Sequence, residues 1–293
     1  MNGHPSCLCR AGKTAGVTAA FLLLSLASPA FAHRIEKRFT VETNPVVSVR
    51  NKSGRITVKS WQRPEVLVVA THVSQKTEVA AEQMGNRVDL VTHLLSENVG
   101  AAELEANYEI TVPEQTELQI RNDSGDVVVE HVSGDMTFDT VAAGVELQEV
   151  AGSLVVKTVS GSLTCIRCAG RIEVNSISGS FRLVQPVSSN VRAQTYSGNI
   201  FFDGAFQRGG TYILKNYTGT IEVLFSQSDS FDLSANSMQG TVENDAAPLK
   251  PFTHGTQRSV PRFAGSFVGT YNQGQARVEL SSFSGTIKIR KRE

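Results

Sequence analysis

The sequence predicts an all-β fold, a parallel β-helix (solenoid) of strand-corner units of roughly nine residues, two per coil. Two observations predict it: a short Ser-Gly or Ala-Gly phrase recurs through residues 122–181, and the same apolar positions follow each glycine. The phrases are Ser124-Gly125, Ser133-Gly134, Ala151-Gly152, Ser160-Gly161, Ala169-Gly170 and Ser178-Gly179. A repeat of this kind is typical of stacked units that bury one continuous core.

Apolar residues occupy the second, fourth and seventh positions after each glycine, as in Val127, Val129 and Val132 after Gly125. The second and fourth positions share one face of a strand because side chains alternate along it. The odd step to the seventh position requires a corner, so we expect the seventh residue to point inward too. The predicted core includes Val127, Phe138, Leu147, Val156, Leu163, Val174 and Phe181.

One unit cannot be stable alone. Burial of three apolar side chains contributes about 1.5–3 kcal/mol each. Ordering nine residues costs about 1–2 kcal/mol per residue in backbone entropy. Each unit therefore needs neighbours above and below.

The repeat continues with looser spacing after Phe181. The glycines at 198, 219 and 240 are 21 residues apart, which predicts an internal stack of Tyr196, Tyr217 and Met238. The pattern resumes at Val278, and the closing Arg290, Lys291 and Arg292 are expected to charge the last exposed strand edge.

The N-terminal part divides into two segments. Residues 1–32 read as a signal peptide: Arg10 and Lys13 precede a short apolar run, and Ala30-Phe31-Ala32 matches a cleavage site before His33. Residues 33–115 are predicted to form an N-terminal β cap and residues 116–293 the β-helix repeat domain. Within the cap, Glu78–Met84 is predicted to form one or two helical turns.

The signal peptide predicts export to the periplasm, the cell surface or the medium, with no stable membrane span after cleavage. Cleavage removes two of the 28 Lys and Arg residues and none of the 28 Asp and Glu residues, so the net charge becomes slightly negative. Nucleic acid is therefore not an expected partner, because phosphate binding needs a basic surface. The predicted partner is an unknown glycan or cell-envelope protein.

The chain resembles the bacterial exported family named "putative adhesin". The resemblance rests on Asn51–Val58, on Trp61 ahead of Val66–Ala70, on Tyr108–Pro113, and on the Ser-Gly units through Ile289. It covers nearly all of the chain after residue 32. It implies a parallel β-helix with an N-terminal β cap, exported from a bacterium, and it brings no functional residues.

Cys165 and Cys168 form a C-x-x-C at positions where other units place apolar residues. The register favours buried thiols that fill space in the core. A local disulfide is the alternative in an oxidising compartment. Redox chemistry or half a zinc site has less support, because no helix opens at this motif and no second ligand pair is suitably spaced.

The remaining polar residues predict no catalytic, metal or cofactor site. Asp123, Asp126, Asp135 and Asp139 lie close in sequence but lack the spacing of calcium-binding β-rolls. We therefore predict a non-catalytic adhesin-like or structural protein that binds glycan or protein through flat polar faces. The alternatives are a carbohydrate-active β-helix enzyme and an envelope component of a stress or signalling system.

Overall fold

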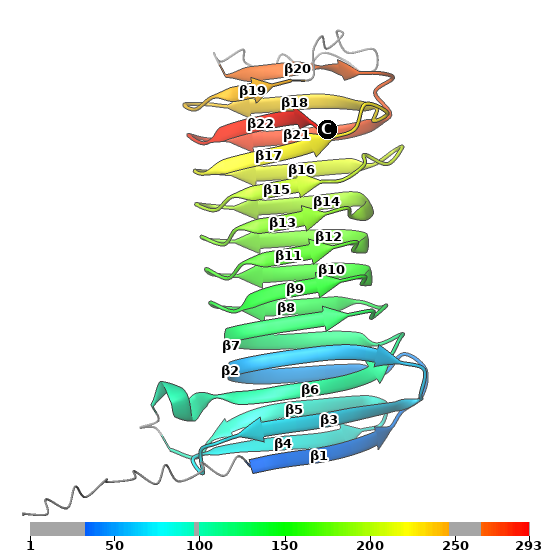
Figure 1. The fold of residues 1–293 in the computed structure, drawn as a ribbon, viewed down its shortest axis with the longest axis vertical. Coiled ribbons are helices and arrows are strands. Elements are labelled where there is room, and N and C mark those ends of the chain that lie inside the picture. Colours follow the sequence, from blue (N-terminus) through cyan, green and yellow to red (C-terminus); the bar gives the residue numbers. More distant parts are fainter. Residues whose placement is uncertain (1–32, 97–99, 246–264, 293) are drawn as a thin grey trace, which may run out of the picture. The chain divides into compact units, whose positions relative to one another are not determined.

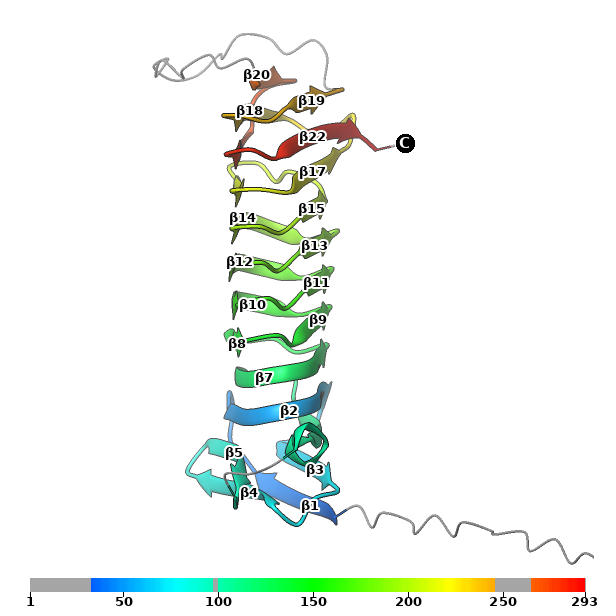
Figure 2. The same ribbon diagram turned by 90° about the vertical axis from the view of Figure 1, so that its left-hand side faces the viewer.

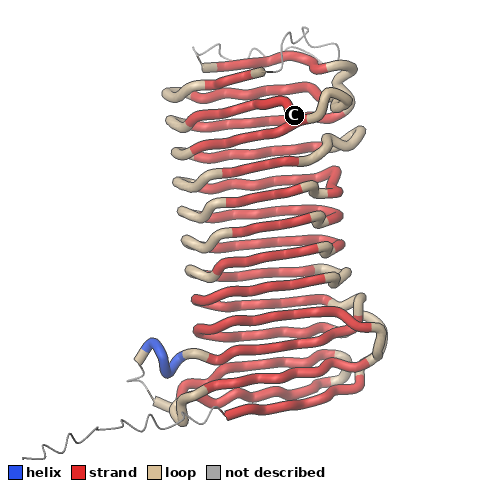
Figure 3. The backbone as a smooth tube through the Cα atoms, viewed as in Figure 1, coloured by secondary structure: helices blue, strands red, loops and turns tan. Residues whose placement is uncertain are grey.

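The computed structural model describes residues 33–96, 100–245 and 265–292. The chain divides into two compact units, Met1–Phe31 and Ala32–Glu293, and the described residues belong to the second. The predicted signal peptide therefore lies outside the described residues. These residues form a 22-stranded sheet and one short 3₁₀ helix, η1 (Ala101–Leu104) (Figure 3).

The sheet winds into coils that stack along one axis, and its strands fall on two faces (Figures 1 and 2). In stacking order, face A contains β5 (Arg87–Leu94), the first halves of β2 (Val46–Trp61) and β7 (Glu117–Glu130), β8 (Met136–Thr140), β10 (Ala151–Thr158), β12 (Ala169–Ser176), β14 (Val187–Thr195), β16 (Thr211–Asn216), β21 (Ala276–Ser282) and β18 (Phe231–Ser237). In the same order, face B contains β6 (Ala106–Pro113), the second halves of β2 and β7, β9 (Gly144–Gln148), β11 (Leu163–Ile166), β13 (Phe181–Val184), β15 (Ile200–Asp203), β17 (Thr220–Phe225), β22 (Thr286–Lys291) and β19 (Val242–Asn244).

The strands of neighbouring coils pair in parallel with the predicted register. Leu154 of β10 lies opposite Ile172 of β12, two nine-residue units later in the chain. This confirms the parallel solenoid with two units per coil. The seven predicted core residues are all buried, none more than 2% exposed.

The two corners of each coil are built differently. At corner 2, where the chain passes from face B to face A, one residue adopts a positive φ although it is not glycine. These residues are His131 (φ 57°), Glu149 (φ 53°), Arg167 (φ 52°) and Gln185 (φ 49°). In the first three corners the next residue turns inward, and it is the predicted seventh-position residue: Val132, Val150 or Cys168.

At corner 1, where the chain passes from face A to face B, the inward prediction is wrong. Val141, Val159 and Ile177 are 45%, 43% and 58% exposed. The predicted internal stack is wrong for the same reason, because Tyr196 and Tyr217 are 57% and 39% exposed. These apolar side chains point away from the core.

A buried polar residue explains corner 1. The residue before each exposed side chain is Ser, Thr or Asn, and it turns inward. Where glycine follows that Ser or Thr three residues later, the hydroxyl accepts a hydrogen bond from the glycine N–H, as for Thr158 and Gly161 (2.9 Å) or Ser282 and Gly285 (2.8 Å). Thr140 is followed by Ala143 and lacks this bond. Side-chain alternation then directs the following apolar residue outward.

The C-terminal coil is inserted between two earlier coils. Strand β21 pairs in parallel with β16 on one side and β18 on the other, and β22 likewise lies between β17 and β19 (Figure 1). Strand β20 (Ser266–Tyr271) then pairs antiparallel with β18. Phe283 therefore lies between Tyr217 and Met238, which the 21-residue spacing does not reveal.

This insertion also overturns the prediction that the basic C-terminus charges the last strand edge. Strand β22 is an interior strand, and Arg290 forms ion pairs with Glu222 (3.4 Å) and Glu243 (3.8 Å) on its two neighbours. Arg292 pairs with Asp203. These basic side chains therefore bridge stacked strands.

The N-terminal strands close the other end of the stack. Strand β3 (Glu65–His72) pairs antiparallel with both β1 (His33–Thr40) and β6. The predicted helical turns at Glu78–Met84 are wrong, since β4 (Thr77–Met84) is a strand paired with β5. Val79 and Ala81 alternate toward the core, and this cross-strand packing overrides a weak local helix preference. The division between residues 33–115 and 116–293 stays a prediction.

Candidate binding surfaces

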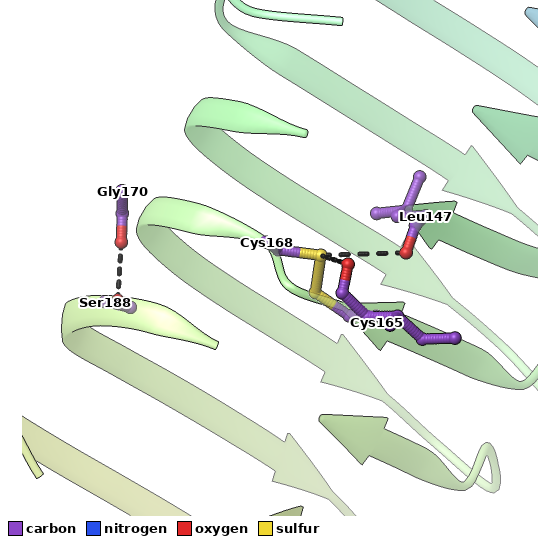
Figure 4. The surroundings of a disulfide bond; sticks show 6 residues. Leu147, Cys165, Cys168, Gly170 and Ser188 are labelled. Atoms are coloured by element: carbon purple, nitrogen blue, oxygen red, sulfur yellow. Dashed lines mark hydrogen bonds between the residues drawn. A yellow bond between two sulfur atoms is a disulfide. The ribbon is translucent and has the colours of Figure 1, made fainter. Parts of the chain in front are cut away.

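The two cysteines lie in the core between stacked coils (Figure 4). Cys165 is 0% and Cys168 1% exposed, and Cys165 stacks between Leu147 and Leu183. The sulfur atoms lie at bonding distance and the Cα atoms 6.0 Å apart, a separation that a disulfide can span. Both sulfurs are shielded from solvent, so the pair offers no open position for a substrate.

We expect the double substitution of Cys165 and Cys168 by serine to destabilise the fold, because a buried hydroxyl without a partner costs about 1–3 kcal/mol. The matching double valine variant should be less destabilised. If a disulfide is present, closing so short a loop contributes about 2 kcal/mol by the chain-entropy relation. Thermal melts with and without reductant measure these differences. A folded valine variant that lost a thiol-oxidoreductase activity or a bound metal of the wild type would contradict a packing role.

The four aspartates near the start of the repeat do not converge. Asp123 forms an ion pair with Lys52 (3.1 Å) and Asp126 with Arg55 (2.9 Å). Asp126 lies opposite Gly144 in the next coil, not opposite another acid. Among the described residues, no three His, Cys, Asp or Glu side chains are grouped closely enough to hold a metal ion.

Two adjoining hollows on face B form the candidate site, here called the face B hollow. The larger has a volume of 640 Å³ and extends from β6 across β2 to β7, and the smaller, of 280 Å³, continues over β9 and β11. They share Arg55 and Asp126, whose ion pair lies between them. The surface is thus recessed over several neighbouring strands.

Missing side chains and fixed polar groups shape this hollow. Gly144 has no side chain, and a Cβ there would lie 3.3 Å from the Asp126 carboxylate and 3.7 Å from the Ser162 hydroxyl. Asn107 accepts the backbone N–H of Arg55 at 2.7 Å and donates to the Glu105 carboxylate at 3.0 Å. The hollow therefore presents hydrogen-bond donors and acceptors, among them the positively charged Arg55 and the negatively charged Asp126.

The profile of the family described as Toastrack DUF4097 matches residues 46–290, which span both faces, the hollow and the inserted C-terminal coil. The chain belongs to the Toastrack DUF4097 family. The resemblance to the bacterial putative adhesin family is confirmed at the level of this family.

Solved structures similar to this Toastrack chain share little sequence with it. A "putative adhesin" from Bacteroides fragilis is 12% identical, with 89% of this chain and 97% of that chain covered and a TM-score of 0.40. A "putative cell adhesion protein" from Clostridium sporogenes is 10% identical, with 89% and 100% covered and a TM-score of 0.27. A "putative adhesin" from Parabacteroides merdae is 6% identical, with 89% and 96% covered and a TM-score of 0.32. No curated protein matches the chain.

Within the described part of this Toastrack chain, no helix is both long and apolar enough to cross a membrane.

The sequence analysis did not identify the residues that line the face B hollow of this Toastrack chain. In the sequence, Gly144 stands one residue later than the spacing of the other glycines predicts, and in the structure it lines the smaller hollow. Asn107 and Arg55 gave no such signal, because their contact joins strands 52 residues apart in the chain. Only the pairing of β6 with β2 brings them together.

Proposed function

We propose that this chain is an exported, non-catalytic, adhesin-like solenoid that binds a glycan or protein through face B. The observation that carries the proposal is the face B hollow, a recess that crosses several coils and is lined by Arg55, Asn107, Asp126 and Ser162. Such groups can donate to and accept from hydroxyl and amide groups. An extended polar ligand lying across the strands fits this arrangement.

The non-catalytic part of the proposal rests on exposure. The carboxylates that border the hollow, Glu105, Glu109, Asp126 and Glu146, all face solvent. A glycosidase needs an acid whose surroundings raise its pKa, commonly by burial in an apolar pocket. Incubation with polysaccharides and analysis of the products tests the enzyme alternative, which gains support if new chain ends form.

Export is supported by the sequence of residues 1–32. N-terminal sequencing of protein from the envelope fraction should give His33 as the first residue. Recovery of the intact chain from Met1 in the cytoplasm would remove this part of the proposal.

A screen of the purified protein against glycans and envelope proteins tests binding, with Gly144→Tyr as the diagnostic variant. No positive φ restricts Gly144, and the nearest atoms to an added Cβ are ends of side chains, so tyrosine should fill the hollow without unfolding the coil. We expect a ligand found in the screen to lose affinity at least about tenfold, or about 1.4 kcal/mol.

The matched control is Thr137→Tyr, an exposed position on β8 of face A. It should leave affinity unchanged. If both variants bind as well as the wild type, the ligand does not use the hollow, and if the screen finds no ligand, the binding proposal fails.

A further inference from the structure

Corner 1 carries a continuous column of exposed apolar side chains, here called the apolar ladder. The strand registers place the residues that precede them directly opposite one another: Thr140, Thr158, Ser176, Thr195, Asn216, Ser282 and Ser237. The ladder follows in the same order as Val141, Val159, Ile177, Tyr196, Tyr217, Phe283 and Met238. Folding does not require these side chains to be apolar, because they face away from the core.

The ladder is large enough to form an interface. Six of its members are 39–58% exposed, and Phe283 is partly buried. If a free side chain of this size presents about 150–200 Å², the ladder exposes on the order of 500 Å². Soluble monomers seldom expose larger contiguous apolar patches. Two such surfaces together bury about 1,000 Å², where specific protein interfaces begin.

The ring geometry disfavours a sugar as the occupant. The rings of Tyr196 and Tyr217 stack with centroids 4.6 Å apart, and those of Tyr217 and Phe283 with centroids 4.4 Å apart, both at an interplanar angle of 6°. Their faces cover one another, so mainly ring edges meet the solvent. A sugar that stacks on an aromatic face would have to separate these rings.

The surroundings of the ladder are poor in charge. The neighbouring column on face B consists of Ser162, Ser180, Asn199, Thr220, Thr286 and Thr241. On face A, the charged residues at the position beside the ladder are Asp139 and Lys157, which lie opposite each other, and Lys215, which is paired with Glu279 at 2.9 Å. Corner 2 differs, because Glu149 forms an ion pair with Arg167 there and also contacts His131. Interface cores are depleted in charge, so corner 1 has the composition of a contact surface.

The distance between successive ladder side chains indicates which kind of partner can match them. Its side chains recur once per coil, at the strand separation of about 4.8 Å. Side chains on one face of an extended peptide recur at about 6.7 Å, and the turns of a helix at about 5.4 Å. A second solenoid of the same pitch keeps its side chains in register over seven coils, whereas an extended peptide or a helix does not.

We propose that the apolar ladder binds a second copy of this chain, in a two-fold dimer whose solenoid axes run antiparallel. Tyr196 is the middle member, so it lies at the two-fold axis and faces the Tyr196 of its copy. Val159 then faces Phe283, and Val141 faces Met238. Small side chains at one end meet large ones at the other, which makes the surface self-complementary as two-fold symmetry requires.

Sedimentation velocity of the purified protein over a range of concentrations tests the dimer. We expect a reversible monomer–dimer equilibrium that Tyr196→Asp weakens at least about 100-fold, because two carboxylates would meet at the axis. The matched control is Val187→Asp, an exposed valine (56%) outside the ladder, which should leave the equilibrium unchanged. Circular dichroism melts establish that both variants are folded.

Cysteine cross-linking tests the antiparallel geometry separately. A mixture of Val141→Cys and Met238→Cys should give a covalent dimer of the two variants under mild oxidation, whereas Val141→Cys alone, Val187→Cys and the wild type should not. In a parallel dimer Val141→Cys would instead be joined to its own copy. A monomeric wild type at all concentrations, a Tyr196→Asp variant that dimerises normally, or cross-linking of Val141→Cys to itself would overturn the proposal. The hollow and the ladder adjoin at Ser162 but use different side chains, so loss of ligand binding in Gly144→Tyr with an intact dimer would separate the two functions.

Discussion

Substitution of Gly179 by alanine should destabilise the solenoid by more than about 3 kcal/mol, beyond the usual range for overpacking an interior. A Cβ at this position would lie 2.1 Å from the carbonyl oxygen of Gly161 in the adjacent coil and 2.7 Å from the Ser176 hydroxyl. The nearest obstacle is backbone, so it cannot move aside without breaking the coil-to-coil pairing. Urea unfolding followed by circular dichroism measures the change.

Gly209→Ala is the control for this experiment. Gly209 has a φ of +74°, and an added Cβ would meet nothing within 4 Å. Its substitution should therefore cost only the left-handed backbone penalty of about 1–2 kcal/mol. Equal destabilisation of the two variants would show that close approach of stacked corners is not what requires glycine at position 179.

Phe138→Ala should have the second large effect, a loss of about 3–5 kcal/mol in unfolding free energy. Phe138 is 0% exposed and stacks between Ile120 and Val156, so truncation leaves a cavity that the flanking coils cannot close. The same unfolding measurement applies. Hydrogen exchange of the β7, β8 and β10 amides shows whether the loss is confined to neighbouring coils, as nearest-neighbour stacking implies.

Val141→Ala in the same coil is the matched control. Val141 is 45% exposed, so its truncation should change stability by no more than about 0.5 kcal/mol. A cost similar to that of Phe138→Ala would mean that Val141 contributes to the core, as the uniform repeat predicts and the structure does not.

The sequence predicted the second and fourth apolar positions correctly because strand alternation is a local property. Val127 and Val129 are buried because they lie two residues apart on the same face of one strand. The seventh position was predicted correctly at only one corner. A local signal did exist, since Ser, Thr or Asn precedes the exposed residues whereas His131, Glu149 or Arg167 precedes the buried ones. The two corners differ in backbone conformation: the residue before each buried side chain has a positive φ, and this turns the next side chain inward.

The candidate binding surfaces were predicted less well than the fold. Flat polar faces were expected, but the hollow depends on the contact of Asn107 with Arg55 across two coils. Tyr196 and Tyr217 were predicted to stack and do so, on the outside. Phe283 joins them from 66 residues further along the chain, a neighbour that the spacing of the glycines does not indicate.

By itself the sequence determined the solenoid, its period and most of its core, because each coil repeats interactions within about 20 residues that alternation and glycine geometry dictate. The tertiary structure alone decided the order of the last coils. Strand β18 follows β16 more closely in the chain, but β16 pairs with β21, which lies between β16 and β18. That choice completes the apolar ladder, because it brings Phe283 beside Tyr217.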